Sequence, residues 1–244
     1  MTLLTIADAV ADETKGPKPA TIASNTDPAA ENILRLINKV GKRLQKAYAW
    51  NILTKEHSFT APGVETLLSA AAIAAIGDFG RIIPETFWDR GSNNLISGPI
   101  DAVEWQGLKV QTYSSQNKKY RYRGGDIITS PRIDSGVTCA FEYVSINWCD
   151  IAAGSGEKAA FTIDTDVALI DEELIIYGSV FEWLDNEGQP SGNAARKYKD
   201  HFDLLIKADN MNAKVLTAGD IFSQNTRHFT GDPKASRASY GGDF

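Results

Sequence analysis

One segment, residues 27–50, constrains the fold more than any other part of the sequence. It begins with Asp27, which can accept hydrogen bonds from the first helical N–H groups, and with Pro28, which fits the first helical position. Apolar residues then recur at steps of four and three, which places them on one helical face: Ile33, Ile37, Val40, Leu44 and Ala47. The pattern predicts an amphipathic helix that ends near Trp50 and packs this face against a core.

The opposite face of the same helix carries four basic residues, which we call the basic stripe: Arg35, Lys39, Lys42 and Lys46. Two interpretations of this pattern remain open. The stripe can be the solvated face of a helix in a bundle. It can also contact an acidic surface of a partner or the phosphates of DNA, because both attract cations.

The length and charge of the chain restrict the classes to which it can belong. With 244 residues, 43% of them hydrophobic and 23% charged, it can bury a sizeable core, which excludes a globally disordered or fibrous protein. A net charge of -6 excludes a dedicated nucleic-acid wrapper, which would carry a clear basic excess. We expect no signal peptide and no membrane segment, since the longest apolar run, residues 67–77, is short and alanine-rich.

The middle of the chain has the alternation that is typical of β-strands. We predict strands at residues 51–62, 109–113, 119–123, 126–129 and 137–148, separated by glycine and proline turns. In the stretch "KKYRYR", alternation places two tyrosines on one side and three cations on the other: Tyr120 and Tyr122 against Lys119, Arg121 and Arg123. The tyrosines can face a core, or the interleaved cations and aromatics can contact nucleic acid.

The two cysteines, Cys139 and Cys149, lie in or just after one predicted strand. An extended segment of this length separates them by roughly 30 Å, which is too far for a disulfide. We therefore expect free thiols in a reducing compartment.

The stretch "ETFWDRGSNNLISGPIDAVEWQ", residues 85–106, sets two tryptophans on either side of a turn. We interpret Trp88 and Trp105 as packing residues, with Asp89 and Arg90 available for a local ion pair. Asp101 is expected to cap a short helix over residues 102–108.

Two further helices are predicted toward the C-terminus, and together they make a helical hairpin. The first begins at Asp171, has acids in its first turn and an apolar body, and stops at Gly188. The second covers about residues 193–209. The sequence beyond residue 212 is polar with spaced aromatic residues: Phe222, Phe229, Tyr240 and Phe244. This tail can become ordered against a partner, or it can be a floppy terminus.

Motifs of known catalytic chemistry are missing. The sequence contains no phosphate-binding loop, no nucleophile elbow, no zinc-protease motif and no C-x-x-C pair. The histidines His57, His201 and His228 show no metal-ligand spacing. The acidic residues between 164 and 173 lack the glycine that a calcium loop requires, and helix capping accounts for them. We therefore predict that the chain is not an enzyme and binds no cofactor or metal.

Four stretches carry a resemblance to a known family: "TDPAAENILRLINKVGKRLQKAYAWNILTKEHSF", "IIPETFWDRGSNNLISGPIDAVEWQGLK", "YRYRGGDIITSPRIDSGVTCAFEYVSINW" and "AAFTIDTDVALIDEELIIYGSVFEW". In this order they resemble structural proteins of tailed bacteriophages. The chain is similar to the head-to-tail connector adaptors of short-tailed phages, also called gatekeeper or tail tubular protein A. The resemblance covers roughly residues 1–208, and none of its motifs is an active site.

The resemblance implies an α+β fold: mainly a helical bundle with an inserted antiparallel β subdomain and an extended C-terminal tail. It implies an adaptor domain over residues 1–211, with the β-rich insertion at about 51–150. Residues 212–244 would be a tail that docks on the portal protein through its four aromatic anchors.

The same resemblance implies a structural role in the virion neck, between capsid and tail, after assembly in the bacterial host cytoplasm. The chain would form a homo-oligomeric ring, expected to be twelvefold, beneath the portal, and its other face would receive tail or nozzle proteins. The lumen would conduct viral double-stranded DNA through transient, non-specific contacts. The alternatives are a sequence-independent DNA-binding module, another neck or tail component, and a tail-associated hydrolase.

Overall fold

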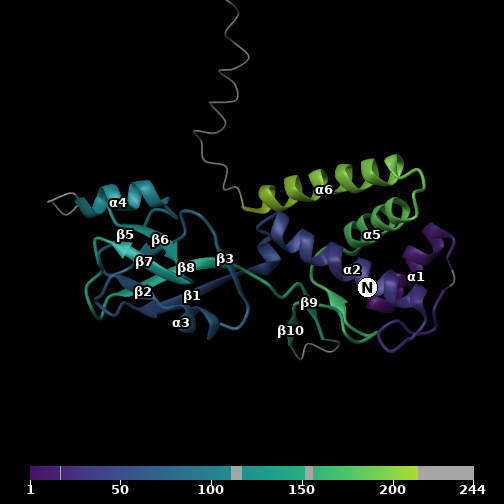
Figure 1. The fold of residues 1–244 in the computed structure, drawn as a ribbon, viewed down its shortest axis with the longest axis horizontal. Coiled ribbons are helices and arrows are strands. Elements are labelled where there is room, and N and C mark those ends of the chain that lie inside the picture. Colours follow the sequence, from purple (N-terminus) through teal and green to yellow (C-terminus); the bar gives the residue numbers. More distant parts are fainter. Residues whose placement is uncertain (17, 111–116, 152–155, 214–244) are drawn as a thin grey trace, which may run out of the picture. The chain divides into compact units, whose positions relative to one another are not determined.

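The computed structural model describes residues 1–16, 18–110, 117–151 and 156–213, and it has an α+β fold (Figure 1). Contacts within the chain separate residues 1–204 from those that follow. The helices are α1 (Leu3–Thr14), α2 (Pro28–Ala47), α3 (Ala70–Ala74), α4 (Ala102–Val110), α5 (Glu172–Asn186) and α6 (Gly192–Ala213), with a 3-10 turn at Asn51–Leu53. The strands are β1 (Thr54–Thr60), β2 (Thr66–Leu68), β3 (Phe79–Ile82), β4 (Trp88–Asp89), β5 (Asn94–Leu95), β6 (Lys119–Arg123), β7 (Asp126–Ser130), β8 (Thr138–Ser145), β9 (Cys149–Asp150), β10 (Glu157–Lys158) and β11 (Val167–Ala168).

Helices α1, α2 and α5 pack against one another and bury a shared apolar core (Figure 1). Asp27 caps α2 as predicted, accepting a hydrogen bond from the Ala29 N–H at 3.0 Å, and Asp171 caps α5 through the Leu174 N–H at 2.9 Å. The apolar face predicted for α2 is buried at Ile33, Ile37, Val40 and Leu44. Burial of these side chains supplies most of the stability of such a helix, because its intrinsic propensity alone is marginal.

The predicted end of α2 was wrong by about one turn. The helix stops at Ala47, which is exposed rather than inward, and Tyr48 is extended. Trp50 lies beyond the helix, where its indole N–H donates to the Leu44 carbonyl at 2.9 Å. That bond satisfies one of the carbonyls that a helix end leaves without a partner, so Trp50 terminates the helix instead of extending it.

The strands form three antiparallel sheets. In the largest, the order is β1-β8-β4-β5, and β3 also pairs with β8, so β8 lies at the centre (Figure 1). The second sheet has the order β2-β7-β6, and the third has the order β10-β9-β11. Gly124 and Gly125 join β6 to β7 with φ of 63° and 91°, which suits the tight hairpin turn that favours positive φ at both positions.

A core rich in aromatic residues draws most of its members from the largest sheet and from the β2-β7-β6 sheet. Phe141 is at its centre, with ring contacts to Phe59, Phe87 and Tyr143 at centroid distances of 5.2–6.3 Å. Tyr120 also belongs to this core, as the alternation in "KKYRYR" predicted. Tyr122 differs, because its side chain is 38% exposed.

The structure corrects the sequence interpretation at two other places. The strand predicted at 109–113 is wrong where it is described, since Lys109 and Val110 form the last residues of α4. Residues 63–77, for which no element was predicted, contain β2 and α3.

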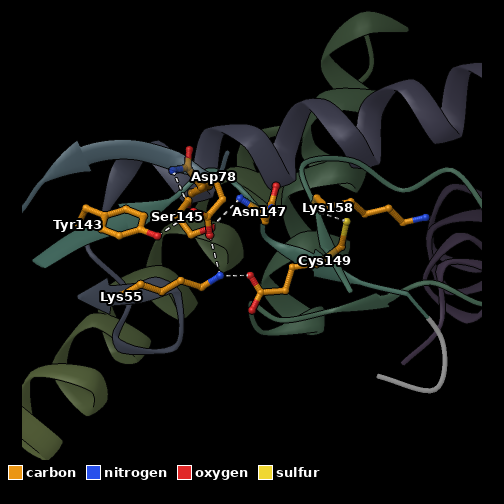
Figure 2. Close-up of polar contacts among 9 residues, drawn as sticks. Lys55, Asp78, Tyr143, Ser145, Asn147, Cys149 and Lys158 are labelled. Atoms are coloured by element: carbon orange, nitrogen blue, oxygen red, sulfur yellow. Dashed lines mark hydrogen bonds and ion pairs between the residues drawn. The ribbon is translucent and has the colours of Figure 1, made fainter. Parts of the chain in front are cut away.

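Both cysteines are free, as predicted, and the structure shows that both are buried. Burial raises the pKa of Cys139 to about 11 and that of Cys149 to about 12. The Cys149 thiol donates to the Lys158 carbonyl at 3.0 Å, across the β9–β10 pair (Figure 2). Because the thiolate is the reactive form, these are structural rather than nucleophilic thiols.

Candidate functional site

The basic stripe is exposed along α2, as predicted: Arg35, Lys39, Lys42 and Lys46. Arg35 donates to the Asn32 amide oxygen at 2.7 Å, one turn earlier. In the part of the chain that the structure describes, Lys42 and Lys46 form no salt bridge. The stripe also borders a hollow of about 580 Å³ on the same helix.

One member of the stripe has a partner that the sequence did not suggest. The Lys39 ammonium lies 2.6 Å from the carboxylate of Glu182 on α5, which also pairs with Arg43. Burial raises the pKa of Glu182, but hydrogen bonds and attraction from both cations outweigh it and leave the pKa below its ordinary value. Lys39 thus holds α2 to α5, and among the described residues the other three cations of the stripe, Arg35, Lys42 and Lys46, have no carboxylate partner.

A second candidate is a polar cluster centred on Asp78, which we call the polar junction: Gln45, Lys55, Asp78, Tyr143, Ser145 and Glu157. Figure 2 shows Asp78 accepting from Tyr143 Oη at 2.7 Å, from Ser145 Oγ at 3.0 Å and from Lys55 Nζ at 2.6 Å. Lys55 also pairs with Glu157, and the Gln45 amide donates to the Ser145 carbonyl at 2.9 Å. The junction therefore ties α2, β1, β8 and β10 together through side chains that are far apart in the sequence.

The chemistry of the polar junction is structural. General acid–base catalysis works best with a pKa near the operating pH, and the groups here are shifted away from neutrality. Burial raises the pKa of Tyr143 to about 12. Burial opposes the charge on Lys55 and Asp78, but their mutual hydrogen bond and attraction prevail, raising the pKa of Lys55 and lowering that of Asp78. The three groups therefore remain in one protonation state around neutral pH.

We expect the free energy of unfolding to decline as the pH falls below about 4. The pKa values of Asp78, Asp89, Asp166 and Glu182 are lowered in the folded state, because cationic partners and hydrogen bonds outweigh the opposing effect of burial. A carboxyl group with a lowered folded-state pKa stabilises the fold above its unfolded pKa of about 4 and loses that contribution as it protonates.

Urea unfolding between pH 7 and pH 3 at constant ionic strength measures this decline. Asp78→Asn should show a shallower decline than the wild type, because it removes one of the four contributing groups. An unchanged unfolding midpoint over this range would contradict the prediction.

The acidic residues between 164 and 173 do more than cap a helix. Capping is right for Asp171 but wrong for Asp164 and Asp166. Asp164 accepts from the Ile22 and Ala23 N–H groups at 3.0 and 2.7 Å. Asp166 is fully buried and accepts from two backbone N–H groups of its own loop, at 2.8 Å each, with Lys158 at 2.7 Å. Asp164 therefore holds the segment before α2 in place, and Asp166 holds its own loop and Lys158 in place.

The predictions for the stretch around the two tryptophans are right for Trp105 and Asp101 and wrong for Trp88 and for the ion pair. Trp105 is buried, and Asp101 caps α4 through the Glu104 N–H at 2.7 Å. Trp88, in contrast, is 43% exposed. The predicted ion pair between Asp89 and Arg90 is wrong. Asp89 is fully buried and pairs with Lys118, whereas Arg90 pairs with Glu56 on β1.

Three of the four cations of "KKYRYR" have partners within the chain, which weakens a nucleic-acid role for this strand. Lys118 pairs with Asp89 and Lys119 with Glu104, while the Arg123 guanidinium lies 3.8 Å from Glu65. Together with the buried ring of Tyr120, these pairs favour the interpretation as a core-facing strand.

The predicted tail anchors, Phe222, Phe229, Tyr240 and Phe244, lie outside the described residues. Within the described ranges, no group of three or more His, Cys, Asp or Glu side chains is placed to hold a metal ion. No described helix is long and apolar enough to cross a bilayer. Comparison with known protein families and with curated proteins finds no match for this chain.

Proposed function

We propose that this chain is a non-enzymatic structural subunit of a bacteriophage, the head-to-tail adaptor that joins the portal vertex to the tail. In this proposal the folded part is a helical bundle with a β-rich insertion, and copies assemble into a ring, expected to be twelvefold. Residues 212–244 dock on the portal protein, and the ring's other face receives tail or nozzle proteins. The lumen is a conduit for DNA during packaging and ejection.

The observation that carries the proposal is the exposed basic stripe on a chain whose net charge is -6. The polar junction, Glu182 and the buried aspartates are occupied in holding the fold together, whereas Lys42 and Lys46 remain available for a partner. A conduit must also let DNA slide, and each neutralised phosphate adds to affinity. A modest basic stripe on an acidic protein meets both requirements.

The resemblance adds a second argument. Its four stretches include α2 with most of β1, β4 and β5 with most of α4, nearly all of β6 to β8, and β11 with most of α5. These elements contribute many of the residues of the buried cores. A likeness spread over core-forming elements supports a shared fold better than one short motif does.

Native mass spectrometry of the full chain mixed with the portal protein of the same genome tests the proposal. The expected result is a complex with one chain per portal subunit. Deleting residues 212–244 should abolish that complex while leaving the folded part intact by circular dichroism. A full-length chain that does not bind the portal would contradict the proposal. A truncated chain that binds the portal as well as the full chain does would contradict the docking role of the tail.

The exposed stripe also keeps a second candidate open, a sequence-independent DNA-binding module. Gel shifts with random duplex DNA at low salt separate the two. Tight binding by the isolated chain, lost in Lys42→Glu with Lys46→Glu, would favour the DNA-binding module, because a conduit requires weak contacts.

A further inference from the structure

The outer side of the largest sheet carries a groove that no part of the described chain fills. It has a volume of about 430 Å³, and we call it the acidic groove: Glu56, Glu85, Trp88, Arg90 and Glu142, with buried Ala140 at its floor. The strand register places Trp88 opposite Ala140 on β8, so the indole stands beside a small residue and is left 43% exposed. The small floor residue and the exposed indole make a hollow with an aromatic wall.

The charge of this groove is negative and partly unpaired. Glu56 and Arg90 neutralise each other, and the buried Asp89 behind them is neutralised by Lys118. Among the residues that the structure describes, Glu85 and Glu142 form no salt bridge. The groove therefore presents two free carboxylates beside an exposed aromatic ring.

The loop that carries Glu85 is held in a defined shape. Thr86 Oγ1 donates to the Ile83 carbonyl at 2.7 Å and accepts from the Glu142 N–H at 3.1 Å, while the Ile83 N–H donates to the Glu142 carbonyl at 2.9 Å. Glu85 itself has φ of 65°, a backbone conformation that costs energy for a residue with a side chain. The bonds on either side hold the backbone around Glu85 against the backbone of Glu142, and both residues line the groove.

We infer that the acidic groove receives the basic stripe of a second copy of this chain, with Lys42 and Lys46 set against Glu85 and Glu142. The inference rests on the proposed ring assembly and names the two surfaces that build it. Lys42 and Lys46 are one helical turn apart, roughly 6 Å along the axis, and both lack carboxylate partners among the described residues. Two free cations on α2 thus match two free carboxylates in the groove.

Trp88 completes the match. Lysine side chains cover apolar surface with their methylene stems while their ammonium groups stay solvated, and an ammonium is attracted to an indole face. The net charge of -6 makes copies repel one another on average, so attraction requires segregated patches such as these two.

Because the stripe and the groove are different surfaces, each copy offers its stripe to one neighbour and its groove to another. Such a head-to-tail contact closes into a ring when the rotation between copies divides the circle. This geometry agrees with the proposed adaptor and does not depend on how the ring meets the portal.

Charge reversal with rescue tests the inference, using sedimentation velocity on the full chain at low salt. Lys42→Glu with Lys46→Glu, and separately Glu85→Lys with Glu142→Lys, should each weaken self-association at least about tenfold, because like charges then face each other. The variant that combines all four changes should recover association, since every interface is again complementary. The matched control, Lys197→Glu with Lys199→Glu on the exposed surface of α6, should leave association unchanged.

Carbodiimide cross-linking of a mixture of ¹⁴N and ¹⁵N chains gives an independent readout. Mixed-isotope peptides that join residues 42 or 46 to residues 85 or 142 are expected. Three results would overturn the inference. The chain could stay monomeric at high concentration, the variant with all four substitutions could fail to recover self-association, or the mixed-isotope links could be confined to other surfaces.

Binding to the portal is scored separately by native mass spectrometry. A chain that binds the portal but shows no stripe–groove contact refutes only this inference. A chain that self-associates through these surfaces yet ignores the portal refutes only the adaptor role.

Discussion

Replacing Gly41 by alanine is expected to lower the free energy of unfolding by about 3 kcal/mol, as overpacking of a rigid core does. Gly41 lies where α2 meets Trp148, and an added Cβ would overlap three atoms of the indole ring. The ring has no room to retreat, because it is fully buried, packs edge-on against Phe161 at 4.8 Å and donates to the Ala159 carbonyl at 2.8 Å. Urea unfolding monitored by tryptophan fluorescence measures the loss.

Gly107→Ala is the matched control for this substitution. Gly107 also lies within a helix, α4, but a Cβ there meets no atom within 4 Å. Alanine should therefore stabilise the chain by about 0.5–1 kcal/mol through its higher helix propensity. If Gly41→Ala were as stable as Gly107→Ala, the close approach of α2 to Trp148 would be refuted.

Replacing Asp78 by alanine should cost about 3 kcal/mol, the lower end of the range for breaking a buried ion pair. The Asp78 side chain is only 13% exposed, and its removal leaves the Tyr143 and Ser145 hydroxyls without their acceptor. The expected total includes the desolvation cost of these two stranded hydroxyls, which is about 1 kcal/mol each at the lower end of its range. Lys55 keeps Glu157 as a partner, so we expect the loss of stability to lie at the lower end of the range for a broken ion pair.

Two further variants define what Asp78 contributes. Asp78→Asn should fall between alanine and the wild type, because an amide oxygen still accepts hydrogen bonds but does not neutralise Lys55. Asp203→Ala, at an exposed position of α6, should change stability by no more than about 0.5 kcal/mol. Equal effects of Asp78→Ala and Asp203→Ala in chemical denaturation would show that the polar junction does not stabilise the fold.

Features encoded within a few residues were predictable from the sequence. The start of α2 at Asp27 and Pro28, the start of α5 at Asp171 and the turn at Gly124–Gly125 depend on neighbours within about one turn of chain. The exposure of the basic stripe followed from helical periodicity in the same way. The adaptor role stays a proposal, because it rests on the resemblance and on surfaces whose partners remain to be tested.

The partners of buried charges could not be predicted, because they depend on how distant segments meet. Asp89 was paired by proximity with Arg90, but the sheet turns its carboxylate inward to Lys118 and turns Arg90 toward Glu56. Lys39 meets Glu182 across 143 residues, and Asp78 meets Lys55, Tyr143 and Ser145 from separate elements. Sequence patterns contain the charges but not these contacts.

By itself the sequence determined the capped helices, the tight turn and the basic face of α2, since caps and periodicity act over a few residues. Only the tertiary structure decided that Trp88 lies at the surface, that Lys39 is tied to α5, and that Glu85 and Glu142 are left together without cationic partners among the described residues. The physical reason is that these contacts depend on how distant segments align, as in the register of paired strands. That alignment decides which side chains lie on the same side of a sheet, and no local propensity encodes it.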